Sequence, residues 1–303
     1  MANTLLTPNI IARAALANLY ETTVMAPLVH RDYEPEFAAR RGDTITIRKP
    51  AVFTAEEYVR ANGITIQDAT ESGVDVTLNH FADVSFAVTA EDLTLKIQDF
   101  NEQLLAPAME AIAQKIDRDL LAIRDDITAE VGQAGTTGTH DWDDPRVMID
   151  AGKTLNQANV PLTERRFVFG PVTAAAYQAD PLFHEADRRG DTDGLMEAAI
   201  GRKFGLDNYM TQNISVPPQT SGNSTTEVGV AFHRTAVALA FRPLALPRGA
   251  QNAAIETYKG FGLRVVYDYD IDKKQDVVSI DCLYGVKTLD ADRAVLVKGA
   301  DVV

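Results

Sequence analysis

The sequence is short of cysteine, of basic residues and of long apolar runs, and each shortage excludes a class of protein. Cys282 is the single cysteine in 303 residues, so an intrachain disulfide cannot form, and a zinc site would need histidines. Lys and Arg number 29 against 43 Asp and Glu, a net charge of −14, which argues against nucleic-acid binding because phosphate affinity comes from basic charge. No apolar run approaches the roughly 18 residues of a membrane span. These shortages favour a protein of a reducing compartment with no membrane partner.

What the sequence does contain is ordinary globular composition, with 46% apolar and 24% charged residues, which excludes wholesale disorder. At roughly 100–200 residues per domain, the length allows two domains, or one large domain with excursions. A β-patterned excursion comes first, a long helical stripe follows, and the chain ends in strands. This order predicts an α+β fold.

Two segments in the first third of the chain alternate polar and apolar residues, as half-buried strands do. They are Asp43–Arg48 and Val74–Asn79, and Asn62-Gly63 between them suits a turn with positive φ. We therefore predict a long antiparallel excursion over residues 41–79. A two-stranded ribbon is at best marginally stable alone in water, so this one needs a surface to lie on, in this chain or in another.

The strongest periodic signal is an apolar stripe with steps of three and four residues. Its members are Leu93, Ile97, Phe100, Leu104, Ala108, Ile112, Ile116, Leu120, Ile123 and Ile127. The stripe predicts a helix over 90–131, which Pro107 should kink or divide in two. A coiled-coil arm and a scaffold helix crossing a flat domain both fit. The steps are mostly four rather than the 3.5 average of a coiled coil, which favours the scaffold helix.

Each partial match to a catalytic or metal-binding motif lacks residues that the motif requires. Asp268–Asp272 resembles the start of a calcium loop, but Lys273 stands where that loop needs glycine and Ser279 where it needs glutamate. The five histidines form no His-x-x-x-His pair, and no Gly-x-Ser-x-Gly elbow occurs. We therefore predict no catalytic residue, no cofactor and no metal ligand. A carboxylate-dependent hydrolase stays open as an alternative, since no spacing selects a pair among the 43 acids.

Several short stretches are weak singly but specific in their order and spacing. They are Asn3-Thr4-Leu5, Ile10–Leu19, Val29–Tyr33, Gly42–Pro50, Glu91–Leu95, Pro107–Met109, Ile116–Leu120, Arg264–Asp270 and Gly285–Lys287. Together they resemble the major capsid (coat) protein of tailed bacteriophages, in the group typified by the coat protein of a short-tailed Salmonella phage. The resemblance covers nearly the whole chain.

The resemblance implies the Hong Kong-type capsid fold and a division of the chain. Residues 1–40 would form the N-terminal arm, 41–79 the extended β-hairpin loop, 80–141 the peripheral domain with its long spine helix, 142–245 the axial domain, and 246–303 the returning strands of the peripheral domain. Relatives carry a large insertion in the axial domain. Here only the polar stretch 212–227 stands in its place, so we expect that insertion to be absent or reduced.

The resemblance also implies a structural role in the virion. Copies of the chain would assemble in the host bacterial cytoplasm, as hexamers and pentamers, into the icosahedral head that encloses double-stranded DNA. Scaffold protein, portal and a decoration protein would be its other partners. An encapsulin-like nanocompartment shell is the first alternative. The candidate contacts between subunits are Glu56, Glu57 and Arg60 at the tip of the excursion, and Arg188, Arg189, Asp191 and Asp193 on a charged axial loop.

Overall fold

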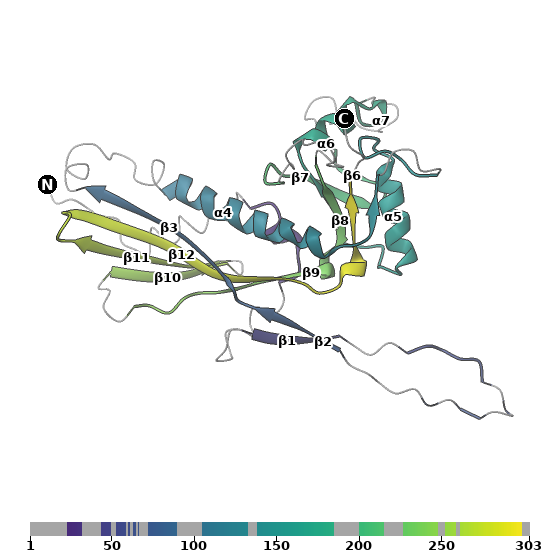
Figure 1. Ribbon diagram of the computed structural model, residues 1–303, viewed down its shortest axis with the longest axis horizontal. Coiled ribbons are helices and arrows are strands. Elements are labelled where there is room, and N and C mark those ends of the chain that lie inside the picture. The colour runs from purple at the N-terminus through teal and green to yellow at the C-terminus, as the bar shows by residue number, and fades with distance from the viewer. Residues whose placement is uncertain are drawn as a thin grey trace.

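The structure is a computed structural model, and it describes most of the chain. The described residues are 23–31, 44–49, 53–58, 60, 63–64, 66, 72–89, 105–132, 138–184, 200–214, 227–247, 252–258 and 261–298. Figure 1 shows a long sheet crossed by one helix, a second body of helices and strands at one end, and a two-stranded ribbon that projects away from both. The α+β class expected from the sequence is confirmed.

The long sheet is antiparallel and has the order β10-β11-β12-β3, with β9 alongside the last part of β12. Its strands are β3 (His80–Thr89), β9 (Val237–Arg242), β10 (Asn252–Tyr258), β11 (Phe261–Asp270) and β12 (Gln275–Thr288). Alternate residues of β12 are buried on one face, where Ile280 and Tyr284 join the largest apolar cluster. The apolar side chains of helix α4 (Ala106–Leu121) belong to the same cluster, so α4 is the scaffold helix that covers this face.

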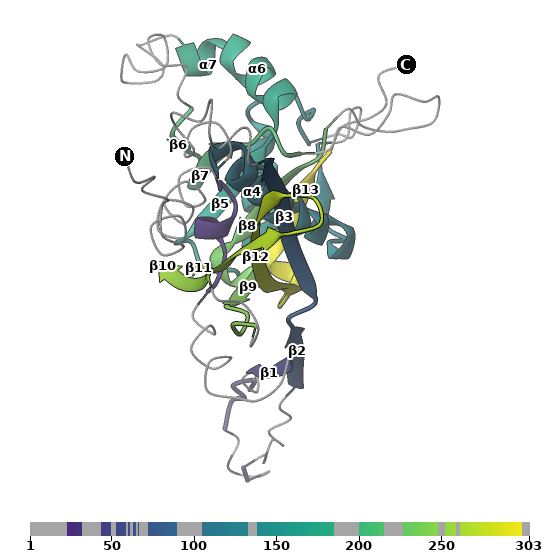
Figure 2. The ribbon, with the colours of Figure 1, turned by 90° about the vertical axis from the view of Figure 1, so that its left-hand side faces the viewer.

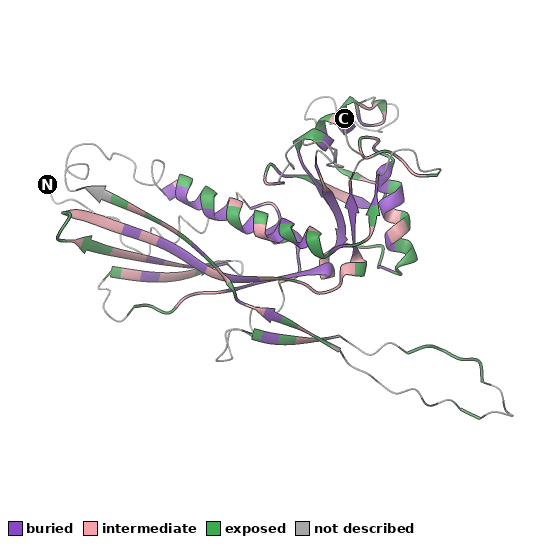
Figure 3. Cartoon of the chain, viewed as in Figure 1, coloured by how far each residue is buried: buried purple, intermediate pink, exposed green. Residues whose placement is uncertain are grey.

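Helix α4 confirms part of the predicted stripe and corrects its limits. Ile112, Ile116 and Leu120 are buried along one side, which Figure 3 shows as the side turned to the sheet. Pro107 lies in the first turn of the described helix, where no acceptor is available for a backbone N–H and a proline is tolerated. The kink or division expected at Pro107 stays a prediction. The stretch before residue 105 lies outside the described residues.

The expected helix end at residue 131 is wrong. The α-helix ends at Leu121, a 3₁₀ turn covers Ala122–Asp126, and Glu130–Val131 form strand β4. Ile123 and Ile127 are nevertheless buried, so the stripe reports burial rather than helical backbone. Val131 is β-branched and pairs with Val297 in a parallel ladder, an arrangement that favours strand over helix at this point.

The second body holds a sheet of order β4-β13-β8-β5-β7-β6. Its further strands are β5 (Arg165–Phe169), β6 (Arg202–Lys203), β7 (Leu206–Met210), β8 (Gly229–His233) and β13 (Ala294–Val297). Helices α5 (Val147–Gln157), α6 (Pro171–Ala179) and α7 (Pro181–His184) contribute to its core with Phe167, Phe169 and Tyr177. Strand β13 departs from the expectation for 246–303, because it pairs with β4 and β8 in this sheet rather than with the long sheet. Its residues alternate between two cores: Val295 and Val297 are buried in this body, and Ala294 and Leu296 in the α4 cluster.

A buried carboxylate fixes the start of α6 against strand β8. The Glu227 side chain accepts hydrogen bonds from the backbone N–H groups of Gly170 (2.8 Å), Val172 (3.1 Å) and Thr173 (3.2 Å), and only 1% of Glu227 is exposed. These are the donors that a helix start leaves without partners, and the helix dipole favours a negative charge there.

We predict that Glu227→Ala lowers the free energy of unfolding by about 2–3 kcal/mol, because it leaves buried N–H groups unsatisfied. Glu227→Gln keeps one acceptor oxygen, so its free energy of unfolding should fall by less. Urea unfolding of the two variants beside the wild type measures both effects. Equal stability of Glu227→Ala and wild type would contradict this account of the helix start.

Candidate assembly interface

The projecting ribbon consists of β1 (Thr44–Lys49), β2 (Ser72–Thr77) and the residues between them. The strands are antiparallel, with Ile45 opposite Val76 and Thr46 opposite Asp75. The alternation read from the sequence separates two faces: the Thr46 hydroxyl donates to Asp75 on the exposed face (2.5 Å), whereas Ile45 and Val76 are buried. Figure 2 shows the ribbon leaving the body at one end.

The root of the ribbon is held by a small apolar cluster on the body. Ile45, Val76 and Leu78 contact Ala238 and Ala240 of β9 there. This is the face of β9 and β12 that points away from α4, because the residues alternating with Ala238 and Ala240 belong to the α4 cluster. The ribbon root is therefore part of the folded subunit.

The root of the ribbon can approach strand β12 this closely because residue 285 is a glycine. A Cβ at Gly285 of β12 would lie 2.3 Å from the carbonyl oxygen of Thr77 and 3.2 Å from the Cα of Leu78. Real Cβ atoms are essentially never that close to backbone atoms. Gly285 is thus the point at which the ribbon backbone rests directly on the sheet.

Beyond the root, the ribbon exposes apolar side chains that no part of the described chain covers. The exposed fractions are 61% for Phe53, 65% for Tyr58, 78% for Ile64 and 84% for Ile66. Figure 3 shows the described residues of this far portion as exposed. Four large apolar residues on one projecting segment are typical of a surface that is completed by a partner.

The charged candidate contacts fall partly within this segment. Glu56, Glu57 and Arg60 are exposed on the ribbon, so the structure brings these three together with the apolar side chains. Arg188, Arg189, Asp191 and Asp193 lie outside the described residues. Within the ribbon, the sequence analysis selected charged residues and no apolar ones. The signal for the exposed apolar side chains was present in two short apolar runs of the excursion, at 51–53 and 63–66.

A polar cluster marks the junction between the ribbon and β3. Asp119 of α4 accepts a hydrogen bond from the Tyr284 hydroxyl (2.5 Å) and lies 3.1 Å from Lys115 Nζ and 3.3 Å from His80 Nδ1. The His80 ring stacks on Tyr284, with 5.3 Å between the centroids. Burial and the bond to Asp119 raise the pKa of Tyr284, so this hydroxyl stays a donor. His80 is the first residue of β3, so the cluster ties the ribbon exit to α4 and β12.

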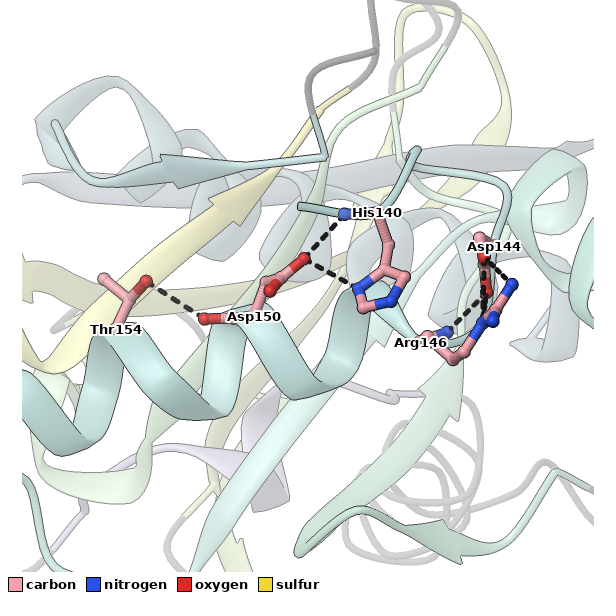
Figure 4. Close-up of polar contacts among 5 residues, drawn as sticks. All are labelled: His140, Asp144, Arg146, Asp150 and Thr154. Atoms are coloured by element: carbon pink, nitrogen blue, oxygen red, sulfur yellow. Dashed lines mark hydrogen bonds and ion pairs between the residues drawn. The ribbon is translucent and has the colours of Figure 1, made fainter. Parts of the chain in front are cut away.

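A second polar cluster lies at the start of α5 (Figure 4). Asp150 accepts from both the backbone N–H (2.8 Å) and the Nδ1 (2.9 Å) of His140, and Asp144 pairs with Arg146. Partial burial would raise the pKa of Asp144, but hydrogen bonds from Arg146 outweigh it and the pKa is lowered. The hydroxyl of Thr154 donates a hydrogen bond to the backbone carbonyl of Asp150 (3.0 Å), one turn back along α5.

Two features are absent from the part of the chain that the structure describes. No group of three or more His, Cys, Asp or Glu side chains there is placed to hold a metal ion. In the same residues, no helix combines the length and apolar character needed to cross a membrane. Burial raises the pKa of Cys282 to about 12, so this thiol stays protonated at neutral pH.

Comparison with solved structures identifies the fold. A chain of Mycobacterium phage Che8 matches with a TM-score of 0.66 and 22% identity, over 91% of this chain and 90% of that one. A chain of the capsid of the cyanophage P-SCSP1u matches with a TM-score of 0.65 and 13% identity, over 92% and 88%. A virus-like particle from Pyrococcus furiosus matches with a TM-score of 0.52 and 10% identity, over 96% and 98%. No protein-family model and no curated protein matches the sequence. The chain therefore has the Hong Kong-type fold of tailed-phage capsid subunits.

Proposed function

We propose that the chain is the major capsid protein of a tailed bacteriophage, a non-enzymatic subunit that assembles with copies of itself into an icosahedral head around double-stranded DNA. The observation that carries the proposal is the ribbon, whose root is buried on its own body while its far portion exposes Phe53, Tyr58, Ile64 and Ile66. In a shell, a neighbouring subunit covers those side chains. The capsid fold supports this use of the ribbon.

The finer assignments belong to the same proposal. Hexamers and pentamers would be the capsomers, and scaffold protein, portal and a decoration protein the further partners. We assign 1–40 as the N-terminal arm, 41–79 as the extended loop, 80–141 and the strands after residue 246 as the peripheral domain, and 142–245 as the axial domain, with β13 returning to the axial sheet. The relationship to the Salmonella short-tailed phage group rests on the sequence resemblance alone.

An encapsulin-like compartment is the second candidate, favoured by the match that spans 98% of the chain of the Pyrococcus virus-like particle. The phage match has the higher TM-score and identity, which is why we place the capsid first. Shell contents separate the two proposals. Packaged double-stranded DNA supports the capsid, and a protein cargo supports the compartment.

Electron microscopy of the expressed chain tests the shared part of the proposal. We expect closed shells tens of nanometres across, or hexamers and pentamers, when the purified chain is concentrated alone or with its scaffold protein. A chain that stays monomeric in both preparations, or a small oligomer with hydrolase activity, would contradict a capsid role.

The exposed ribbon residues make a sharper prediction. Ile64→Ser with Ile66→Ser should abolish shells while changing the monomer's stability by no more than about 0.5 kcal/mol, because both side chains are already in solvent. Ile45→Ser, at the buried root, should lower both stability and assembly. Urea unfolding and negative-stain microscopy give the two readouts. Shells of normal yield from the double variant would remove the ribbon from the interface.

Covalent cross-linking of the shell is not expected. Some relatives join an extended-loop lysine to an asparagine, whereas Lys49, the one lysine of 41–79, stands at the end of β1 rather than at the tip. Mature particles boiled in detergent should therefore run as a single 33.0 kDa band. A ladder of multimers on the gel would show that this expectation is wrong.

A further inference from the structure

The hairpin β6–β7 has an unusual residue at its tip. Arg202 pairs with Asp207 and Lys203 with Leu206, which leaves Phe204-Gly205 as a two-residue turn. Both turn residues have positive φ, 50° for Phe204 and 81° for Gly205, as a type I′ turn requires. Asn, Asp and Gly are the residues that favour this position. A bulky aromatic side chain at positive φ is strained.

The described residues of the subunit give no reason for this strain. Phe204 is 42% exposed and belongs to none of the apolar clusters of the described residues. Strain kept at an exposed aromatic residue points to a contact outside the chain.

The rest of the hairpin has the character of a contact surface. Tyr209 is 37% and Met210 48% exposed, although β7 lies between β5 and β6 in the sheet. Strand β6 pairs with only the first two residues of β7, so no described strand lies along the outer edge of its last three residues. The Arg202 side chain is 60% exposed beside them, although it also pairs with Asp207 (3.5 Å), and Lys203 follows it in β6. Apolar and basic groups therefore lie together on this edge of an acidic protein.

The ribbon carries the complementary combination. In the segment 53–58, Phe53 and Tyr58 flank the adjacent acids Glu56 and Glu57, and all four side chains are exposed. The two surfaces belong to different ends of the molecule: Figures 1 and 2 both show β6 and β7 in the second body and the ribbon projecting away on the far side of the long sheet. A contact between them must therefore join two copies.

We propose that the hairpin Arg202–Met210 is the docking site for the ribbon segment 53–58 of a second copy of this chain. The contact joins two different surfaces, so it propagates from copy to copy and closes into a ring when the rotation allows. The inference rests on the proposed function, which places copies side by side, and it assigns the particular surfaces that meet.

Single-cysteine chains test the pairing directly. In a Cys282→Ser background, one full-length chain carries Tyr58→Cys and a second, of distinguishable mass, carries Phe204→Cys. We expect mild oxidation of the mixture to give the mixed disulfide dimer at least tenfold above a mixture of Tyr58→Cys with Leu162→Cys, a residue that is 70% exposed elsewhere on the second body. Glu56→Gln with Glu57→Gln should lower the yield several-fold, as should high salt.

The outcomes separate this inference from the proposed function. Shells of normal yield without the mixed dimer would overturn the docking site and leave the capsid role. The mixed dimer without shells would support the docking site and count against the capsid role. Phe204→Asn gives an independent check: its urea midpoint should equal or exceed that of the wild type, because the turn is relaxed, while its shell yield falls at least tenfold. Unchanged shells from Phe204→Asn would overturn the proposal.

Discussion

Gly285→Ala is expected to prevent shell formation and to destabilise the subunit. The new Cβ would lie 2.3 Å from the Thr77 carbonyl oxygen, and neither atom belongs to a side chain that can rotate away. The root of the ribbon must move off the sheet, which separates Ile45 and Val76 from Ala238 and Ala240. Overpacking of this kind typically costs about 1–3 kcal/mol, and the displaced apolar contacts add to it.

A matched glycine provides the control. A Cβ at Gly152, inside helix α5, meets no atom within 4 Å. Gly152→Ala should therefore raise the stability by roughly 0.5–1 kcal/mol, because alanine suits a helix better than glycine does. Urea unfolding compares the three proteins, and microscopy compares their shells. Wild-type stability and shells in Gly285→Ala would show that the ribbon does not depend on this contact.

The contrast between the two glycines shows what sequence patterns convey. Alternation along 43–48 and 74–79 predicted β1 and β2 because side-chain direction in a strand has a period of two that any single strand displays. The ribbon root against Gly285 joins residues more than two hundred positions apart. Nothing local at Gly285 distinguishes it from a glycine that merely weakens a strand.

The end of α4 shows a second reason why a sequence pattern does not determine the whole structure. Ile123 and Ile127 continue the apolar stripe in step with the helix, yet the backbone leaves the α-helix at Leu121. The apolar stripe indicates which residues are buried, not whether their backbone is helical. The 3₁₀ turn and the extended residue after it bury Ile123 and Ile127 as well as a helix would. The parallel pairing of β4 with β13, which decides the matter, involves residues near the other end of the chain.

The projecting ribbon could be predicted from the sequence in outline, but its exposed apolar side chains could not. A ribbon with no second layer was evident from the sequence, and so was the need for a surface beneath it. The apolar side chains Phe53, Ile64 and Ile66 are more exposed than such residues usually are, and only coordinates reveal exposure. Phe204 is harder still to foresee, since the strain depends on the positive φ of its turn and the sequence records only an ordinary phenylalanine.

The second large effect concerns a carboxylate buried at the meeting point of three segments. Asp117 of α4 has no exposed surface. It accepts hydrogen bonds from the backbone N–H groups of Val24 (3.0 Å) and Met25 (3.0 Å), and from the side chain of Asn213 (3.3 Å). The segment before β1 and the segment after β7 are thus joined to the scaffold helix through one side chain.

Asp117→Ala should lower the free energy of unfolding by roughly 2–5 kcal/mol, because two backbone donors and an amide lose their acceptor in a buried place. Glu110→Ala removes an exposed acid from the same helix and should change stability by no more than about 0.5 kcal/mol. Chemical unfolding measures both. A loss below about 1 kcal/mol in Asp117→Ala would mean that water or neighbouring groups replace the carboxylate.

The same side chain gives the stability a pH dependence with a definite sign. Burial raises the pKa of Asp117 above its usual 3.8, and the hydrogen bonds from Val24 and Met25 only partly offset that effect. Between 3.8 and the raised value, the native state holds a proton that the unfolded state has released. Stability contributed by Asp117 is therefore full below 3.8 and falls as the pH rises through the native pKa.

Asp117→Asn isolates this dependence from that of the other carboxylates. Its amide does not titrate, so the wild type should lose stability relative to Asp117→Asn as the pH rises above about 4, and the difference should become constant once the pH exceeds the native pKa. Urea unfolding of the pair at closely spaced pH values provides the test. A difference that is flat with pH, or that grows in favour of the wild type, would show that the hydrogen bonds from Val24, Met25 and Asn213 stabilise the ionised carboxylate more than burial disfavours it.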